Sequence, residues 1–440
     1  MSTIARLHRR SAALVLAAVL LLLGLAGSAP ADSRVPPRTG FETRGGSSWT
    51  TGAEEADFLD AVRGRGGRAE IRRIGTTRQG RPLRLVRLGR PPAPEHPVLL
   101  LICGQHGDEP AGREACLSTV RDLAFTEHTP TGTQSPARRA REELLRRTTV
   151  LVLPTANPDG FALGTRNNSE NADVNRDHIV LRTAEARAIA GVLRDYRPDL
   201  VVDLHEYHAL EPQYTSDLLA LWPRHPGVDA GVRAASRALV TDRLRPAAER
   251  AGLAAGVYGL WLDPASGRPM KQVAGDGQET MLRNAVGLKH SLGVLVETRV
   301  NPPGTRIGER PALLRRVRSE QVAVREALAF MARERGAVAA ATAAAWRHGA
   351  DPGPLVLAGA DNAPPAKGET ITRTPCGYWL SREQFTQTRE RLALHGIEVH
   401  PRREGGLVLL DQPLRRLVPL LLDRRARFHL AAAAPVRVCS

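Results

Sequence analysis

Three short apolar runs in this chain lead directly into histidine or glutamate residues, and this coincidence restricts the possible fold most strongly. The runs cover residues 98–103, 200–204 and 292–296. Each is continuous and consists mainly of Val, Leu and Ile, as expected of a strand that is covered on both faces of a sheet. In an open α/β sheet, ligands bind in the loops at the carboxyl ends of the strands. We therefore expect the residues that follow the three runs to meet at one edge of a sheet.

The rest of the chain alternates between strand-like and helical segments. This alternation predicts an α/β fold, with an open mixed sheet and helices on both of its faces, followed by a small C-terminal α+β domain. The further strand-like runs are residues 68–74, 82–88 and 149–153, and the helical segments are residues 53–62, 111–123, 183–196, 230–251 and 311–346.

The N-terminal segment, residues 1–29, is predicted to be a signal peptide. Arg6, Arg9 and Arg10 precede an apolar run over residues 12–25, and small residues follow it. The run is shorter than the roughly 20 apolar residues that a membrane span requires. We therefore expect an exported protein, secreted or otherwise extracytoplasmic, without a membrane span.

Composition divides the remaining chain into three parts. Residues 30–67 form an N-terminal lead-in, whose first part is rich in Pro, Gly, Ser and Thr and is expected to be loose. Residues 68–349 form the predicted catalytic domain. Asp351-Pro-Gly-Pro354 interrupts the helical pattern, so residues 350–440 are predicted to be a small separate domain.

The chain is strongly basic, with a net charge of +16. Almost all of this positive charge is arginine, since lysine occurs only at positions 271, 289 and 367, and aromatic residues make up only 4% of the chain. Single-stranded nucleic acids are usually bound through aromatic stacking as well as charge. We predict no nucleic-acid partner, and the oligomeric state stays open.

The chain has four cysteines, Cys103, Cys116, Cys376 and Cys439. An even number in an oxidising compartment permits disulfides. A Cys376–Cys439 bond would close the C-terminal segment, whereas Cys103 and Cys116 could equally be buried thiols. No CxxC motif is present, so a zinc site built on cysteine is not expected.

His106 and Glu109 form a closely spaced pair, and His205 follows 99 residues later. Two nitrogens and one carboxylate with an open fourth position are how proteins hold catalytic zinc. Zinc in such a site polarises a carbonyl and lowers the pKa of water to about 7. Glu297 could then accept the proton of the attacking water. An isolated HxxE has little meaning, and His106 alone could be an ordinary loop histidine.

A second zinc motif is rejected. His205-Glu206-Tyr207-His208 is one residue shorter than HExxH, and a strand or loop would not present two histidines at helical spacing.

Further motifs follow in a fixed order: Asn157-Pro-Asp-Gly160, Arg166, Asp173-Val-Asn175-Arg176, Asp203-Leu-His205 and Glu297-Thr-Arg299. Together with His106-Gly-Asp-Glu109, they resemble the carboxypeptidase A-like zinc metallopeptidases of the metallocarboxypeptidase superfamily. The resemblance extends over about residues 71–330. It implies the fold of the zinc carboxypeptidases for the catalytic domain.

The resemblance also implies the chemistry of the site. It identifies His106, Glu109 and His205 as ligands of one Zn²⁺ per chain. Glu297 corresponds to the general acid/base, and Arg166 to the group that stabilises the oxyanion.

The same resemblance assigns three supporting residues. Asn175 and Arg176 correspond to the residues that bind the terminal carboxylate of the substrate, which an arginine can grip through two parallel hydrogen bonds. Asp173 corresponds to a carboxylate that orients His106 from behind.

Some positions depart from the family pattern. Asp108 stands between the first two ligands where the best-known members have arginine, and Asp177 and His178 replace the usual residues after Arg176. Tyr258 is a candidate for the mobile active-site tyrosine, although it lies 39 residues before Glu297. These differences affect the expected substrate rather than the zinc chemistry.

The predicted function is therefore that of an exported zinc metallocarboxypeptidase, which hydrolyses the C-terminal amide bond of peptides. Its substrate would be a peptide or an acylated amino acid with a free carboxylate. A deacylase or amidase of the same fold, acting on acylated amino acids or wall peptides, is the alternative enzyme, and a wall-binding scaffold is the alternative outside catalysis. Asp276 and Glu279 indicate a preference for a basic side chain, unless both acids face solvent.

Overall fold

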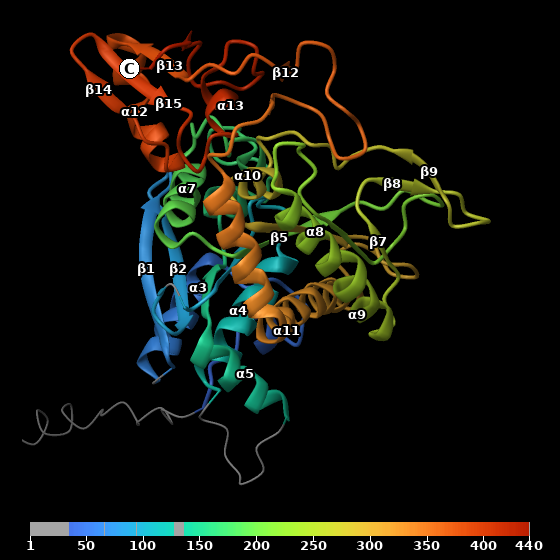
Figure 1. The fold of residues 1–440 in the computed structure, drawn as a ribbon. Coiled ribbons are helices and arrows are strands. Elements are labelled where there is room, and N and C mark those ends of the chain that lie inside the picture. The colour runs from blue at the N-terminus through green and yellow to red at the C-terminus, as the bar shows by residue number, and fades with distance from the viewer. Residues whose placement is uncertain (1–34, 66, 94, 127–135, 440) are drawn as a thin grey trace, which may run out of the picture.

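A computed structural model describes residues 35–439, except residues 66, 94 and 127–135. The predicted signal peptide lies outside these residues. The central feature is an eight-stranded sheet in the order β1-β2-β4-β3-β5-β10-β6-β7 (Figure 1). Its strands are β1 (Ala69–Thr76), β2 (Pro82–Gly89), β3 (Val98–Cys103), β4 (Thr149–Leu153), β5 (Leu200–Tyr207), β6 (Leu218–Leu221), β7 (Ala255–Val257) and β10 (Leu292–Arg299).

The sheet is mixed, as the sequence predicts. Strands β4, β3, β5 and β10 run parallel. Strands β1 and β2 pair antiparallel with their neighbours, and β6 pairs antiparallel with β10 and parallel with β7. The carboxyl ends of β3, β5 and β10 consequently lie at the same edge. In the register between β5 and β10, His205 is the direct partner of Glu297.

Helices cover both faces of the sheet. Alternate residues of β3 separate the two cores: Leu99 and Leu101 pack with α4 and α11, and Leu100 and Ile102 pack with α7 and α10. The alternation follows from the pleat of a strand, which directs successive side chains to opposite faces. The covering helices are α4 (Ala111–Ala124), α5 (Pro136–Arg147), α7 (Ala184–Tyr196), α8 (Ala230–Ala238), α9 (Arg245–Arg250), α10 (Leu282–Leu288) and α11 (Arg310–His348), with a π-helical turn at Leu239–Leu244 between α8 and α9.

The first part of the described N-terminal lead-in is packed rather than loose, and the later part forms the helix predicted at residues 53–62. The two helices are α2 (Gly40–Thr43) and α3 (Gly52–Gly64), and the side chains of Thr39 and Thr51 cap their first turns in capping boxes. The threonines that make this segment look like a loop are therefore helix caps, because their hydroxyls accept hydrogen bonds from the free N–H groups of the first turn.

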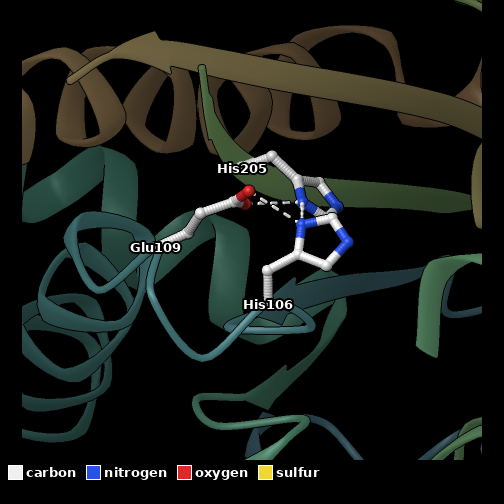
Figure 2. Close-up of side chains that lie close together, drawn as sticks. All are labelled: His106, Glu109 and His205. Carbon is white, nitrogen blue, oxygen red and sulfur yellow. Dashed lines mark hydrogen bonds and ion pairs between the residues drawn. The ribbon is translucent and has the colours of Figure 1, made fainter. Parts of the chain in front are cut away.

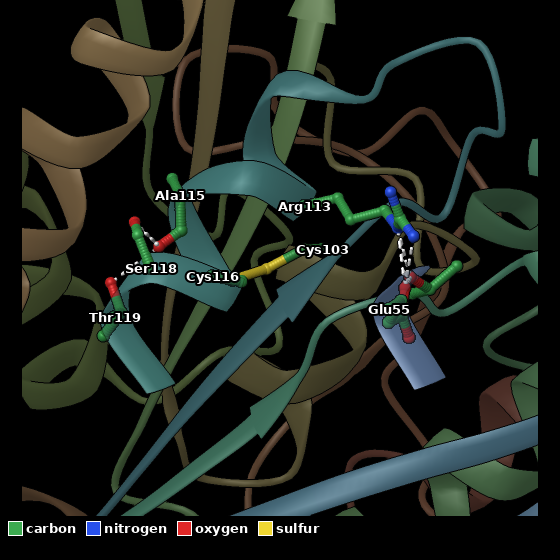
Figure 3. The surroundings of a disulfide bond; sticks show 8 residues. Glu55, Cys103, Arg113, Ala115, Cys116, Ser118 and Thr119 are labelled. Atoms are coloured by element: carbon green, nitrogen blue, oxygen red, sulfur yellow. Dashed lines mark hydrogen bonds and ion pairs between the residues drawn. A yellow bond between two sulfur atoms is a disulfide. The ribbon is translucent and has the colours of Figure 1, made fainter. Parts of the chain in front are cut away.

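Two contacts attach α4 to its surroundings (Figure 3). A disulfide between Cys103 and Cys116 joins β3 to α4. At the start of α4, the buried Arg113 forms an ion pair with Glu55 of α3 at 2.7 Å. A second disulfide joins Cys376 to Cys439, so all four cysteines form disulfides.

Beyond α11, the chain forms the predicted small C-terminal α+β domain. A four-stranded antiparallel sheet, β14-β15-β13-β16, is accompanied by α12, which contacts α7 of the catalytic domain (Figure 1). The elements are β11 (Leu355–Val356), β12 (Thr370–Ile371), β13 (Gly377–Ser381), α12 (Arg382–His395), β14 (His400–Arg402), β15 (Gly405–Leu409), α13 (Val418–Leu422) and β16 (Ala434–Val436).

The remaining shorter elements are α6 (Pro158–Leu163), the single turn Val174–Arg176 and the hairpin of β8 (Leu260–Leu262) and β9 (Pro269–Gln272). Among the described residues, no helix combines the length and apolar character needed to cross a membrane.

Candidate active site

His106, Glu109 and His205 converge at the carboxyl edge of the sheet (Figure 2). His106 follows β3 after Gly104, whose φ of 66° turns the chain sharply, and Glu109 immediately precedes the first turn of α4. The two oxygens of Glu109 lie 2.8 Å from Nδ1 of His106 and 2.9 Å from Nδ1 of His205. The two Nδ1 atoms are 3.0 Å apart.

The other nitrogen of each ring contacts a carboxylate. Nε2 of His106 is 3.1 Å from Oδ1 of Asp173, and Nε2 of His205 is 2.9 Å from Oδ2 of Asp203. A neutral imidazole carries one N–H, and a carboxylate partner keeps that hydrogen on Nε2. Both Nδ1 atoms are then acceptors that face each other and a carboxylate. Such a set of three converging acceptors fits a cation, and its composition fits zinc.

Glu109 and Asp173 remain ionised. Burial alone would raise the pKa of Glu109, but His106 and His205 hold it well below its ordinary value. In the same way, His106 and Arg166 offset the burial of Asp173 and lower its pKa. An ionised carboxylate is the form that ligates a metal or orients an imidazole.

Glu297 lies on β10 beside His205 and faces the active-site cavity. Only 8% of its surface is exposed. Burial raises the pKa of Glu297 to about 8, although His205 and Arg166 act in the opposite direction. A carboxylate with a raised pKa in a cleft has the property needed to accept and return a proton near neutral pH.

Arg166 lies at the rim of the ligand cluster. Its guanidinium donates hydrogen bonds to Oδ2 of Asp173 at 3.0 and 3.2 Å and to Oε1 of Glu109 at 3.3 Å. Since the side chain also lines the cavity, its charge is available to a negatively charged group of a substrate.

Asn175 and Arg176 occupy the turn Val174–Arg176, whose first N–H groups Asp173 caps. Oδ1 of Asn175 accepts a hydrogen bond from the backbone of Leu282 at 2.8 Å, and its Nδ2 lies 3.1 Å from Nε2 of His205. Asn175 thus also holds the turn against α10 and β5. Arg176 donates to the backbone oxygen of Asn175 at 2.9 Å and forms no ion pair with any described carboxylate.

The structure brings all predicted site residues together around one cavity of about 730 Å³. His205 and Asp173 lie behind the wall, and their positions follow from the contacts given above. The predicted residues that line the cavity directly are His106, Glu109, Arg166, Asn175, Arg176 and Glu297.

Three further residues belong to the site. Asp203 orients His205, and its position two residues earlier on the same strand already indicated that both face the same side. Tyr258 lines the cavity, and the charge of Glu297 is the largest influence that raises its pKa. Arg283 also lines the cavity, but no motif of the sequence identified it.

The model of the zinc carboxypeptidase family matches residues 56–212. Carboxypeptidase 2 of Trichophyton tonsurans is 32% identical over 203 residues, which cover 44% of this chain and 36% of that protein. Carboxypeptidase E of Caenorhabditis elegans is 35% identical over 119 residues, or 24% of each chain. The chain thus spans about a third or less of the length of these relatives.

Among solved structures, a metallo-carboxypeptidase from Pseudomonas aeruginosa has a TM-score of 0.46 and 20% sequence identity, with 65% of this chain and 69% of that chain covered.

Proposed function

Because the chain belongs to the zinc carboxypeptidase family, we propose that this metallopeptidase is an exported carboxypeptidase that removes the C-terminal residue of peptides. The observation that carries the proposal is the arrangement of one cavity. The predicted zinc ligands and Glu297 lie at one end of it, and Arg176, without a carboxylate partner among the described residues, lies in the same cavity.

His106, Glu109 and His205 would hold the zinc ion. When bound, zinc supplies Lewis acidity to the carbonyl of the scissile bond and to a water molecule. Asp173 and Asp203 fix the tautomers of the two histidines, so that both Nδ1 atoms remain ligands.

Glu297 would act as the general base and then as the general acid. It accepts a proton from the attacking water and delivers it to the nitrogen of the departing amino acid. Arg166 places a positive charge near the carbonyl oxygen as negative charge develops on it, an electrostatic contribution of a few kcal/mol in comparable sites.

Arg176 would select chain ends. Its guanidinium can bind the free carboxylate of the last residue, which an internal peptide bond does not possess. Export is supported by the signal-like segment at residues 1–29 and by two disulfides, since disulfides persist mainly in oxidising compartments.

The test compares a peptide with the same peptide carrying a C-terminal amide, using protein that contains about one zinc per chain. The free acid should be cleaved with release of its last residue, and the amide should be cleaved far more slowly. Equal cleavage of both would refute the carboxypeptidase proposal, and normal zinc content in His205→Ala would refute the ligand assignment. Release of amino acids from acylated amino acids alone would identify the deacylase alternative.

A further inference from the structure

Arg283 is a buried arginine in the wall of the active-site cavity, in the first turn of α10. Only 2% of its surface is exposed. One Nη atom donates to the backbone oxygen of Asp276, and the other lies 3.5 Å from the sulfur of Met281. Its Nε has no hydrogen-bond partner, and no described carboxylate forms an ion pair with it.

Such a position is unfavourable for a cation. Burial is the main reason that the pKa of Arg283 falls to about 10; Asp276 and Tyr258 raise this pKa, whereas Arg224 and Arg176 lower it. The group is nevertheless charged at neutral pH. A buried charge without a counter-ion destabilises a protein by several kcal/mol, so such groups are normally paired. An anionic ligand in the cavity would supply the missing partner.

The arginines that line the cavity differ in whether they form ion pairs with carboxylates of the protein. Two of them form ion pairs with carboxylates of the protein, Arg166 with Asp173 and Arg316 with Glu206. Arg176 and Arg283 form none within the described residues. The cavity therefore presents two guanidinium groups that the protein itself leaves without a carboxylate.

The acids in the neighbouring loop supply this charge only in part. Asp276 lines the cavity, and its charge raises the pKa of Arg283, but its side chain is exposed to solvent and forms no ion pair with Arg283. Glu279 is buried and is not among the residues that line the cavity. The preference for a basic side chain, which these two acids suggested in the sequence, thus rests on Asp276 alone, and Arg283 donates a hydrogen bond to the backbone of the same residue.

We propose that the cavity accepts a C-terminal residue with a second carboxylate, glutamate or aspartate, and that Arg283 binds the side-chain carboxylate while Arg176 binds the terminal one. The inference rests on the proposed carboxypeptidase function and names its substrate class. Arg283 is then a specificity-determining residue, because its fork of donors can form charge-assisted hydrogen bonds with a carboxylate but not with an apolar or basic side chain.

The experiment measures kcat/KM of the zinc-loaded enzyme for four acylated dipeptides that differ only in the last residue: Glu, Gln, Leu or Lys. Gln has nearly the shape of Glu without its charge. The wild-type enzyme should prefer Glu to Gln by about 10- to 100-fold, the size expected for hydrogen bonds to a charged group. A wild-type preference for Leu or Lys over Glu overturns the inference without any variant.

Arg283→Gln should reduce the Glu-to-Gln ratio of kcat/KM to near one, and Arg283→Lys should give an intermediate ratio. Arg237→Gln, which removes one positive charge from an exposed position on α8, should leave the ratio unchanged. Zinc content and melting temperature confirm that each variant is folded.

The outcomes separate the two proposals. An unchanged Glu-to-Gln ratio in Arg283→Gln, or an equal loss for all four substrates, would overturn the inference, the latter because Arg283 would then bind the terminal carboxylate. In both cases, cleavage that still requires a free C-terminus would leave the carboxypeptidase function intact. Cleavage of C-terminal amides would instead refute the proposed function.

Discussion

Two groups of residues around the active-site cavity, the metal-ligand end and the pocket end, differ in whether their charged side chains have partners within the protein. At the metal-ligand end, His106, Glu109 and His205 each have partners within the protein, and those partners lie on the strands and turns of one sheet edge. At the pocket end, Arg176 and Arg283 face the cavity without a carboxylate of the described chain. The first end is organised without a ligand, whereas under our proposal the carboxylates of the substrate would complete the second. Catalysis and specificity would then be supported by different kinds of structure.

The largest effect is expected from a substitution that removes the proposed general base and leaves the metal ligands in place. Glu297→Gln should lower kcat by roughly 10²–10⁴-fold, because an amide cannot accept the proton of water. Zinc analysis of the same preparation should show normal metal content, since Glu297 is not among the converging ligands. Near-normal turnover in the zinc-containing variant would mean that another residue is the base.

The second prediction tests whether the carboxylate of Asp203 holds His205 in the orientation that binds zinc. Asp203→Asn should weaken zinc binding by roughly 10–100-fold, as measured by competition with a chelator, because the amide orients His205 less strongly. Asp199→Asn is a matched control, since Asp199 immediately precedes β5, at the opposite end of the strand, and contacts Thr342 and the backbone of Val98. Equal loss of zinc affinity in both variants would indicate a general effect on the sheet.

Tyr258 lies between the two ends, since its charged neighbours include Glu297 and Arg283. If its hydroxyl contacts the substrate, Tyr258→Phe should lower kcat/KM by roughly 2- to 10-fold, the value of one neutral hydrogen bond. Tyr378→Phe makes the same chemical change in the C-terminal domain, where the hydroxyl donates to Asp423 at 2.8 Å. It should alter stability only, and a comparable loss of kcat/KM there would contradict the assignment.

The smallest expected effect is on the stability of the protein after zinc is removed with a chelator, and it depends on the protonation of Glu297. Glu297 keeps its proton in the folded protein up to about pH 8, whereas the unfolded chain loses it near the ordinary pKa of a glutamate. Between these values folding takes up a proton, so this group makes the metal-free protein less stable as pH rises. Glu297→Gln should therefore raise the melting temperature of the metal-free protein by a few degrees at pH 8.5 and by less at pH 5. A larger gain at pH 5 would contradict the raised pKa.

Much of the ligand end could be predicted from the sequence, for a local reason. The parallel strands β3, β5 and β10 end at the same edge, so residues that directly follow or terminate them must lie close together. His106, Glu109, His205 and Glu297 are attached to these ends, and their positions required no knowledge of contacts elsewhere. The helices over the two faces were predictable in the same way, from the period of their apolar residues.

The described N-terminal segment shows why other features were not predictable. The composition of residues 35–50 is that of a loop, yet the threonines cap helices and the segment packs against α4. Nothing local distinguishes a threonine in a cap from a threonine in a loop, because the difference depends on whether the following residues find a surface to cover.

The sequence by itself determined the α/β sheet and the convergence of His106, Glu109, His205 and Glu297 at one edge of it, because each depends on a short stretch of chain attached to a strand. Only the tertiary structure decided that Cys103 bonds to Cys116, that the lead-in is packed and that Arg283 enters the cavity without a carboxylate. These features depend on which groups from distant parts of the chain come into contact, and on which groups do not. Whether a buried charge has a partner depends on residues from distant parts of the chain, so the residues next to it in the sequence do not predict that the partner is missing.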